Sequence, residues 1–155
     1  MKARWEKVSF EEYAKGKNSN EAASYNSIVL PYRATKGSAG YDIATPIALK
    51  FPEDSGKVVD LGIRIFLPID EVLLVMPRSG LGFKYNMRLA NTVGVIDSDY
   101  YNSDNEGHIK VKLLCDVPCE FNAGDRICQG IIVNYDTAEE EEITKSRNGG
   151  FGSTN

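Results

Sequence analysis

The stretch HIKVKLL, residues 108–114, alternates polar and apolar residues, which is the pattern of a β-strand with one buried face. We expect the inner face to carry Ile109, Val111 and Leu113, and the outer face to carry His108, Lys110 and Lys112. Similar short apolar or alternating runs predict further strands over residues 28–31, 47–51, 57–67, 72–76, 88–93 and 127–133.

Many short strands separated by turn signals, with almost no helix, predict an all-β barrel or sandwich. One short helix is expected over residues 9–15, because Ser9-Phe10-Glu11-Glu12 fits a capping box and Gly16 can end the helix. A loose loop should follow as far as Asn26. The chain then divides into an N-terminal extension (1–27), a β-barrel domain (28–135), and an acidic linker with a C-terminal arm (136–155).

The composition excludes several classes of partner. The chain has 155 residues, enough for one domain with a sizeable core, and a net charge of −4 with a pI near 5.1. This balance argues against nucleic acid, which usually needs a basic face. The longest apolar run, Val72 to Met76, is far too short to span a membrane, and no signal peptide is visible. We expect a cytoplasmic (intracellular) protein without a membrane or nucleic-acid partner.

The three cysteines, Cys115, Cys119 and Cys128, are too few and odd in number for a disulfide framework, which fits a reducing compartment. Their count together with His108 would allow a zinc site, but Cys128 lies in an apolar run and the spacing is wrong. We expect buried free thiols instead.

The segment Pro77-Arg78-Ser79-Gly80 combines groups that can hold phosphate. The rigid proline ends a strand, and Gly80 permits an unusual backbone angle. Arg78 offers a planar fork of donors that matches phosphate oxygens, and Ser79 with backbone N–H groups can complete a cradle.

The segment from Gly94 to Tyr100 carries a candidate base. Val95 and Ile96 should hold a short strand in the core and deliver Asp97 at its end, where an Asp can act as a general base. The ring of Tyr100 follows three residues later, and the combination suggests a nucleotide enzyme. A hairpin with a solvated turn explains these residues equally well.

Two further segments are weaker signals. The small residues before Tyr41 turn the backbone tightly and present Asp42, although a plain turn is the favoured explanation for this segment alone. The tail from Arg147 to Asn155 has three glycines, a cation, a ring and two hydroxyls. This composition favours an arm that closes over a ligand, rather than a disordered terminus.

Taken together, the segments resemble the trimeric dUTP pyrophosphatases (dUTPases), whose five short motifs occur here in the same order. The resemblance covers roughly Ile28 to the C-terminus. It is carried by Ala39-Gly40-Tyr41-Asp42, Pro77-Arg78-Ser79-Gly80, Gly94-Val95-Ile96-Asp97-Ser98-Asp99-Tyr100, Gly124-Asp125-Arg126-Ile127-Cys128-Gln129 and Gly149-Gly150-Phe151-Gly152-Ser153-Thr154.

This resemblance implies a distorted jelly-roll-like β-barrel that assembles as a homotrimer with sites between subunits. It implies Mg²⁺-assisted hydrolysis of dUTP to dUMP and pyrophosphate by in-line attack of water on the α-phosphorus. Such a dUTP diphosphatase limits uracil in DNA and supplies dUMP for thymidylate synthesis.

The resemblance also implies roles for individual residues. Asp97 would activate the water, and Gln129 would contact the α-phosphate and that water. Asp42 would touch Mg²⁺ through water, with the metal riding on the triphosphate. The phosphate chain would be cradled by Arg78, Ser79 and Gly80.

Base selection would come from the hairpin between Arg88 and Lys110, whose backbone groups, including those of Val95 and Ile96, can mimic a pairing partner for uracil. Asn91 would join them, and Lys110 would lie beside the substrate. Cytosine would leave buried groups unpaired.

The sugar and the phosphate chain would be closed in by a ring and an arm. Tyr100 resembles the ring that packs under the deoxyribose and leaves no room for a 2′-hydroxyl. Phe151 of the arm would stack on uracil, and the phosphates would be reached by Arg147, Gly152, Ser153 and Thr154. In the family this arm comes from another subunit.

The chain departs from the usual family pattern in three places. Residues 101–106 are inserted before Gly107, as in some bacterial and phage members. The tail is one residue shorter between Arg147 and Gly149 than in many members, and residues 1–27 have no counterpart in the minimal pattern.

Two alternatives remain at this level. A dCTP deaminase shares the barrel but needs a glutamate near the base and does not rely on the glycine-rich arm. A nucleotide-binding regulatory protein would use the insertion and the N-terminal extension to engage a regulatory protein partner.

Overall fold

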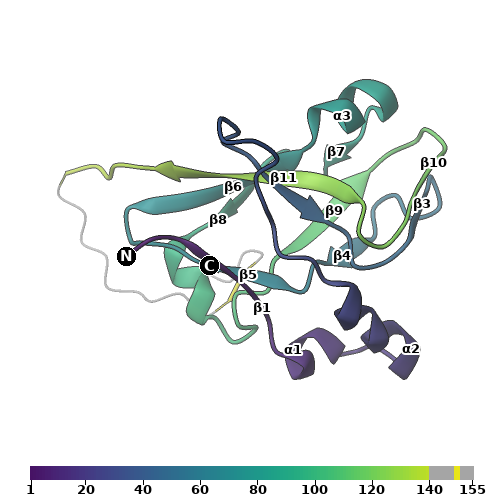
Figure 1. Cartoon of the computed structure of the whole chain (residues 1–155), viewed down its shortest axis with the longest axis horizontal. Coiled ribbons are helices and arrows are strands. Elements are labelled where there is room, and N and C mark those ends of the chain that lie inside the picture. The colour runs from purple at the N-terminus through teal and green to yellow at the C-terminus, as the bar shows by residue number, and fades with distance from the viewer. Residues whose placement is uncertain (140–148, 151–155) are drawn as a thin grey trace.

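The computed structural model describes residues 1–139 and 149–150, and most of its regular structure is extended (Figure 1). The strands are β1 (Arg4–Lys7), β2 (Tyr41–Ala44), β3 (Leu49–Phe51), β4 (Val58–Asp60), β5 (Ile63–Phe66), β6 (Glu71–Pro77), β7 (Arg88–Leu89), β8 (Gly94–Ile96), β9 (Lys110–Leu114), β10 (Cys119–Phe121) and β11 (Arg126–Asn134). The helices are α1 (Phe10–Ala14), α2 (Ser19–Ala22) and α3 (Ser79–Tyr85), with 3-10 turns η1 (Ala23–Ser27) and η2 (Ser98–Asn102). The all-β class is confirmed.

Antiparallel pairing joins the described strands into sheets with the orders β1-β5, β3-β10, β4-β9-β7 and β2-β11-β6-β8. In the largest sheet the long strand β11 lies between β2 and β6, and Figure 1 shows it crossing the width of the molecule. Hydrogen bonding among the described strands does not form one continuous closed barrel. Because β11 is central, the motif that it carries lies beside two other sequence motifs, one on β2 and one at the end of β6.

The core is built from the inward faces of the predicted strands. Ile109, Val111 and Leu113 are all buried, as the alternation in residues 108–114 predicts. Each such side chain contributes about 1.5–3 kcal/mol on burial. The prediction that His108 lies on the outer face is wrong, because β9 begins only at Lys110 and the His108 ring is fully buried beside Tyr13.

The N-terminal residues pack onto this core. Strand β1 pairs with β5, and Val8 and Tyr13 are buried in the main cluster. The predicted helix is confirmed as α1, with Ser9 as its N-cap. The loop predicted as far as Asn26 is wrong, because α2 and η1 fill this stretch, and α2 has a capping box of its own made by Asn18 and Glu21.

One predicted strand is absent and others differ in extent, among them residues 47–51, where β3 begins only at Leu49. Residues 28–31 form no strand: Val29 and Leu30 are 46% and 41% exposed, and only the isolated bridge between Tyr32 and Asp42 follows. The stretch 57–67 is divided into β4 and β5 around Gly62, which has φ +68°. Of the predicted strand 88–93, only Arg88–Leu89 is extended, as β7, and a tight turn follows it.

Helix α3 was not predicted. It begins directly after Arg78, so Ser79 and Gly80 lie in its first turn. Gly80 therefore has an ordinary helical backbone, and the expectation of an unusual angle there is wrong. Within residues 1–139 and 149–150, no helix is long and apolar enough to cross a membrane.

Candidate active site

The register of the largest sheet brings three motifs together. Gln129 of β11 lies opposite Asp42 of β2 on one side and opposite Met76 of β6 on the other. Residues directly opposite each other on neighbouring strands have side chains on the same face. Segments that are far apart in the sequence therefore meet at one place, where β6 ends at Pro77 and Arg78 follows.

Asp42 is held between two guanidinium groups. Its Oδ1 lies 3.0 Å from Arg78 Nε, and its Oδ2 lies 3.0 Å from Arg126 Nη1. The Asp42 side chain is 13% exposed, whereas Arg78 and Arg126 are 33% and 39% exposed. The cluster thus carries one excess positive charge and keeps both cations open to solvent.

Sequence reasoning assigned no role to Arg126, although it lies within one of the quoted motifs. A register shift between Arg126 and Cys128 in the pairing of β11 with β2 accompanies its approach to Asp42. A bulge of this kind re-aims a side chain and cannot be read from composition. In the sequence, the only sign of this role is that Arg126 is a single cation between a turn and an apolar strand.

Gln129 is positioned by a close fit to the first motif. Its Nε2 donates to the carbonyl of Pro77 at 3.2 Å. A Cβ at position 40 would lie 2.7 Å from Gln129 Oε1, closer than real contacts allow. Gly40 therefore makes room for the amide, and Gly40, Pro77 and Gln129 form one tightly fitted unit.

These groups surround a hollow of ≈ 410 Å³, which we call the polar hollow. It is lined by Ala34, Ser38, Ala39, Gly40, Asp42, Arg78, Ser79, Gly80, Leu81 and Gln129. Ser79 and Gly80 contribute backbone N–H groups from the first turn of α3, where donors have no acceptor within the helix. A guanidinium, a hydroxyl, an amide and backbone donors in one place are suited to binding phosphate oxygens.

A second hollow of ≈ 200 Å³, the apolar hollow, shares no lining residue with the first. It is lined by Val58, Val75, Leu89, Ala90, Asn91, Gly94, Ile96, Ile109, Lys110, Val111 and Lys112. Its walls are mainly aliphatic, with Asn91 and the lysines as polar groups. A flat ring with polar edges fits such walls better than a phosphate does.

The turn beside this hollow is strained. Thr92 has φ +68°, an uncommon conformation for a β-branched residue. The backbone N–H of Thr92 donates to Leu89 O and that of Val93 donates to Asn91 O, so the turn is tightly closed. Such strain concentrates at functional sites. Nothing in the sequence marks Thr92 as strained, because a threonine side chain does not favour this angle.

The predicted burial of Val95 is wrong. Gly94 and Ile96 line the apolar hollow, whereas Val95 between them is 58% exposed, as the alternation of a strand requires. Asp97 directly follows β8 and is the N-cap residue of η2. The structure therefore places Asp97 one residue beyond the apolar hollow.

Tyr100 is buried, with 5% of its surface exposed, and Gly150 of the same chain lies against it. A Cβ at Gly150 would lie 2.8 Å from Cε2 of the Tyr100 ring. The remaining predicted arm residues, Arg147, Phe151, Gly152, Ser153 and Thr154, lie outside the described residues.

Lys110 is held by an ion pair with Asp60, which is shared with Lys17 near the N-terminus. Its Nζ lies 3.0 Å from Asp60 Oδ1, and Lys17 bonds the other oxygen of the same carboxylate. Burial acts to raise the pKa of Asp60, but the hydrogen bonds from Lys17 and Lys110 outweigh it and hold the pKa below its usual value. Sequence reasoning missed Asp60, because its partners lie 43 and 50 residues away along the chain.

The cysteines are free thiols, as predicted, and Cys115 and Cys128 are buried. The prediction of burial is wrong for Cys119, which is only partly buried. Burial raises the pKa of Cys128 to about 12, and burial together with neighbouring Cys115 raises that of Cys119 to about 11. Both thiols are therefore protonated and unreactive at neutral pH. Among the described residues, no group of three or more His, Cys, Asp or Glu side chains could hold a metal ion.

Comparison with known proteins places these features in a family. The sequence model of dUTPase matches residues 26–155. A deoxyuridine 5'-triphosphate nucleotidohydrolase of Lactococcus lactis is 37% identical over 132 residues, which are 82% of this chain and 88% of that protein.

Solved structures agree with this match. The dUTPase of Streptococcus mutans has a TM-score of 0.65 at 28% identity, covering 87% of this chain and 98% of that one. A dUTPase from phage phi11 of S. aureus, whose structure shows the coordination of a structural Mg(II) ion, has a TM-score of 0.63 at 17% identity. That comparison covers 94% of this chain and 98% of the phage chain.

Proposed function

The chain belongs to the dUTPase family, and we propose that it hydrolyses dUTP to dUMP with release of pyrophosphate. The observation that carries this proposal is the convergence of Asp42, Arg78 and Gln129 on the polar hollow. Three motifs that lie far apart in the sequence supply a phosphate site there, and a fourth supplies Asp97 beside an apolar hollow.

We assign the triphosphate to the polar hollow. Arg78 offers its guanidinium to phosphate oxygens, while Ser79 and Gly80 offer a hydroxyl and backbone donors. Gln129 contacts the α-phosphate and the attacking water. These donors are in place before substrate arrives, so they can stabilise the charge that develops on phosphate oxygens during displacement.

We assign the uracil ring to the apolar hollow. Asn91 and backbone groups of Val95 and Ile96 pair with the polar edge of the base, and Lys110 lies beside it. The strained turn at Thr92 holds Asn91 in place. Cytosine, with the opposite donor pattern, would leave buried groups unpaired at a cost of about 1–3 kcal/mol each.

Asp97 is the proposed general base that deprotonates the attacking water. Its position at the end of β8, next to Ile96 of the apolar hollow, suits a base that acts close to the nucleoside. Tyr100 follows in the same segment, and we propose that its ring packs under the deoxyribose.

The residues fit Mg²⁺ only as an ion bound mainly by the substrate. Both Asp42 oxygens are already within 3.0 Å of a guanidinium nitrogen, so this carboxylate suits a hydrogen bond to metal-bound water better than direct ligation. Mg²⁺ commonly keeps several waters and binds through substrate phosphates. When bound, the ion would neutralise charge on the triphosphate.

We also propose that the active enzyme is a homotrimer. The polar and apolar hollows of one chain share no lining residue, and a site formed between subunits would bring such parts together. The arm residues Arg147 and Phe151 to Thr154 would close this site. The free thiols suit the reducing interior of a cell, where we propose that the enzyme works.

The structure offers less to the regulatory alternative. The N-terminal extension and the insertion were its expected contact surfaces, yet Glu106 and Tyr101 of the insertion bond Ser9 and Glu6 of the extension. A pull-down with and without dUTP tests for a protein partner that binds in only one state.

The proposed function is tested by mixing the protein with Mg²⁺ and dUTP, dCTP, dTTP or UTP and following pyrophosphate release. We expect release from dUTP alone, with a loss of about 10²–10⁴-fold in Asp97→Asn. Asp116→Asn, the same change at an exposed position outside the five motifs, is the matched control and should remain active. Ammonia from dCTP without release from dUTP would instead identify a deaminase.

A further inference from the structure

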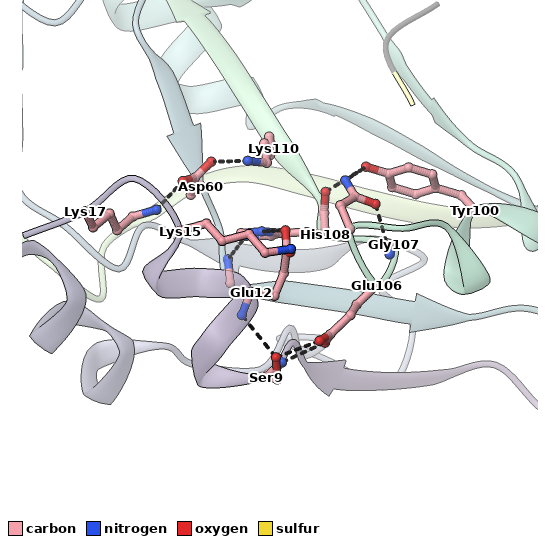
Figure 2. Close-up of polar contacts among 12 residues, drawn as sticks. Ser9, Glu12, Lys15, Lys17, Asp60, Tyr100, Glu106, Gly107, His108 and Lys110 are labelled. Atoms are coloured by element: carbon pink, nitrogen blue, oxygen red, sulfur yellow. Dashed lines mark hydrogen bonds and ion pairs between the residues drawn. The ribbon is translucent and has the colours of Figure 1, made fainter. Parts of the chain in front are cut away.

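The insertion and the N-terminal helix form one polar joint (Figure 2). Ser9 caps α1 by accepting from the Glu12 N–H at 3.1 Å, but the reciprocal carboxylate is not that of Glu12. Glu106 of the insertion accepts from the Ser9 N–H at 2.8 Å and from the Ser9 hydroxyl at 2.6 Å. The sequence predicts a capping box within α1, whereas the structure completes it with a residue 97 positions away.

Glu12 is thereby released to point inward at His108, which is fully buried. The His108 Nε2 accepts from the Gly62 N–H at 3.0 Å, so the proton of the neutral ring is on Nδ1. Nδ1 then donates to Glu12 Oε1 at 3.3 Å. Helix α1 therefore holds the side chain of His108, and it fixes the backbone that leads into β9.

The carbonyl of His108 in turn holds Tyr100. The Tyr100 hydroxyl donates to His108 O at 2.8 Å and accepts from Asn105 Nδ2 at 2.8 Å. Asn105 is itself fixed, because its Oδ1 accepts from the Gly107 N–H and its carbonyl accepts from the His108 N–H. The phenol thus has one partner on each side, and its ring cannot slide without breaking a hydrogen bond.

The loop presses on Tyr100 from a second direction. Gly107 has φ +70°, and a Cβ there would lie 2.8 Å from the Tyr100 carbonyl oxygen. On the ring side, a Cβ at Gly150 would lie 3.2 Å from the Tyr100 hydroxyl oxygen. The edge of the ring that Asn105 holds is therefore the edge that Gly150 approaches.

We propose that Asn105, in the insertion, is a positioning residue that fixes the Tyr100 ring and thereby sets discrimination between deoxyribonucleotide and ribonucleotide. The insertion acts as a brace between helix α1 and this ring. The inference rests on the proposed function, in which the ring packs under the deoxyribose. It assigns a role to residues that the family pattern lacks.

The test compares kcat/KM for dUTP with kcat/KM for UTP in a double-mutant cycle. Asn105→Ala should lower the dUTP/UTP ratio by about tenfold, the effect of losing one buried hydrogen bond. Tyr100→Phe, which keeps the ring but loses the hydroxyl, should lower it by at least as much. In the Tyr100→Phe background, Asn105→Ala should change the ratio little further, because Asn105 acts through the hydroxyl.

The matched control is Asn102→Ala, the same change at an exposed position of the same segment, which should leave the ratio unaltered. A lowered melting temperature in Asn105→Ala with an unchanged ratio would show a purely structural role and overturn the proposal. Additive effects of Asn105→Ala and Tyr100→Phe would also overturn it.

The measurement on the unmutated protein tests the proposed function separately. If the unmutated protein releases no pyrophosphate from dUTP, the proposed function fails. Amide hydrogen exchange over residues 99–110 then still tests whether Asn105 of the insertion holds Tyr100 in place. Faster exchange in Asn105→Ala than in Asn102→Ala supports it, and equal exchange refutes it.

Discussion

The polar hollow and the joint beneath Tyr100 are both built from charged and polar side chains, but they differ in what those side chains face. In the hollow, Arg78 and its ion-pair partner Asp42 are partly exposed and border open space. In the joint, Glu12 and His108 are buried and bond each other.

This difference separates binding from positioning. A partly exposed cation can exchange its carboxylate partner for a phosphate at low cost, since water screens the change. A buried pair cannot do so, because removing one partner leaves an unsatisfied polar group in the core. The first region is therefore suited to ligand turnover, and the second holds the shape of the chain around the ligand.

The largest effect is expected from Arg78→Ala. Loss of a charged donor to the developing phosphate charge should lower kcat/KM for dUTP by about 10²–10³-fold. The fold should remain, because Arg78 is partly exposed and Asp42 keeps Arg126. Steady-state kinetics and a thermal melt measure the two quantities.

Arg78→Lys is the matched variant, since it keeps the charge but loses the planar fork. It should lie between wild type and Arg78→Ala in kcat/KM. If both variants unfold and neither changes kcat/KM per folded molecule, the hollow is a structural ion pair and the contrast between the two regions fails.

Glu12→Ala should instead lower the stability of the fold more than the activity. It leaves the buried His108 Nδ1–H without its acceptor, which costs about 1–3 kcal/mol in the free energy of unfolding. Urea denaturation measures this loss. Glu11→Ala, at an exposed position in the same turn, is the control and should leave the denaturation midpoint unchanged. Equal midpoints for the two variants would show that the joint does not stabilise the fold.

The joint also predicts a pH dependence. Burial and the nearby charge of Lys110 hold the pKa of His108 below its ordinary value of 6.5, although Asp60 and Glu12 act in the other direction. The unfolded chain therefore takes up a proton at a pH where the folded chain does not. Stability should be complete above pH 6.5 and should fall as the pH drops below it, by at most about 1.4 kcal/mol per pH unit.

Urea titrations at several pH values measure this slope. In His108→Gln the amide can accept from Gly62 and donate to Glu12. This variant should lose most of the dependence of stability on pH above pH 5. Glu6 and Glu106 also have lowered pKa values, but they titrate at lower pH, where carboxylates gain protons. An unchanged slope in His108→Gln would remove His108 as the source.

The smallest effect is expected from Lys17→Met. This change removes the ion pair with Asp60, which keeps its second partner Lys110 at 3.0 Å. The apolar stem of methionine can still pack near Tyr13, so the loss should be about 0.2–1 kcal/mol. A loss above about 2 kcal/mol in urea denaturation would show that this bridge behaves like the buried joint rather than like a surface pair.

The sequence by itself determined the all-β class and the strands with strong alternation. The burial of Ile109, Val111 and Leu113 follows from a two-residue period, which is a local property of the chain. The motif residues around Arg78 and Asp97 were found the same way, because turn chemistry and strand ends are also local.

Only the tertiary structure decided which of these local features meet. A bulge in β11 accompanies the approach of Arg126 to Asp42, and the cap of α1 is completed by Glu106 from the insertion. The face of His108 was predicted wrongly because its environment is set by helix α1, far away in the chain. Sequence periodicity reports on near neighbours, whereas hydrogen-bond partners of buried polar groups are chosen by packing across long separations.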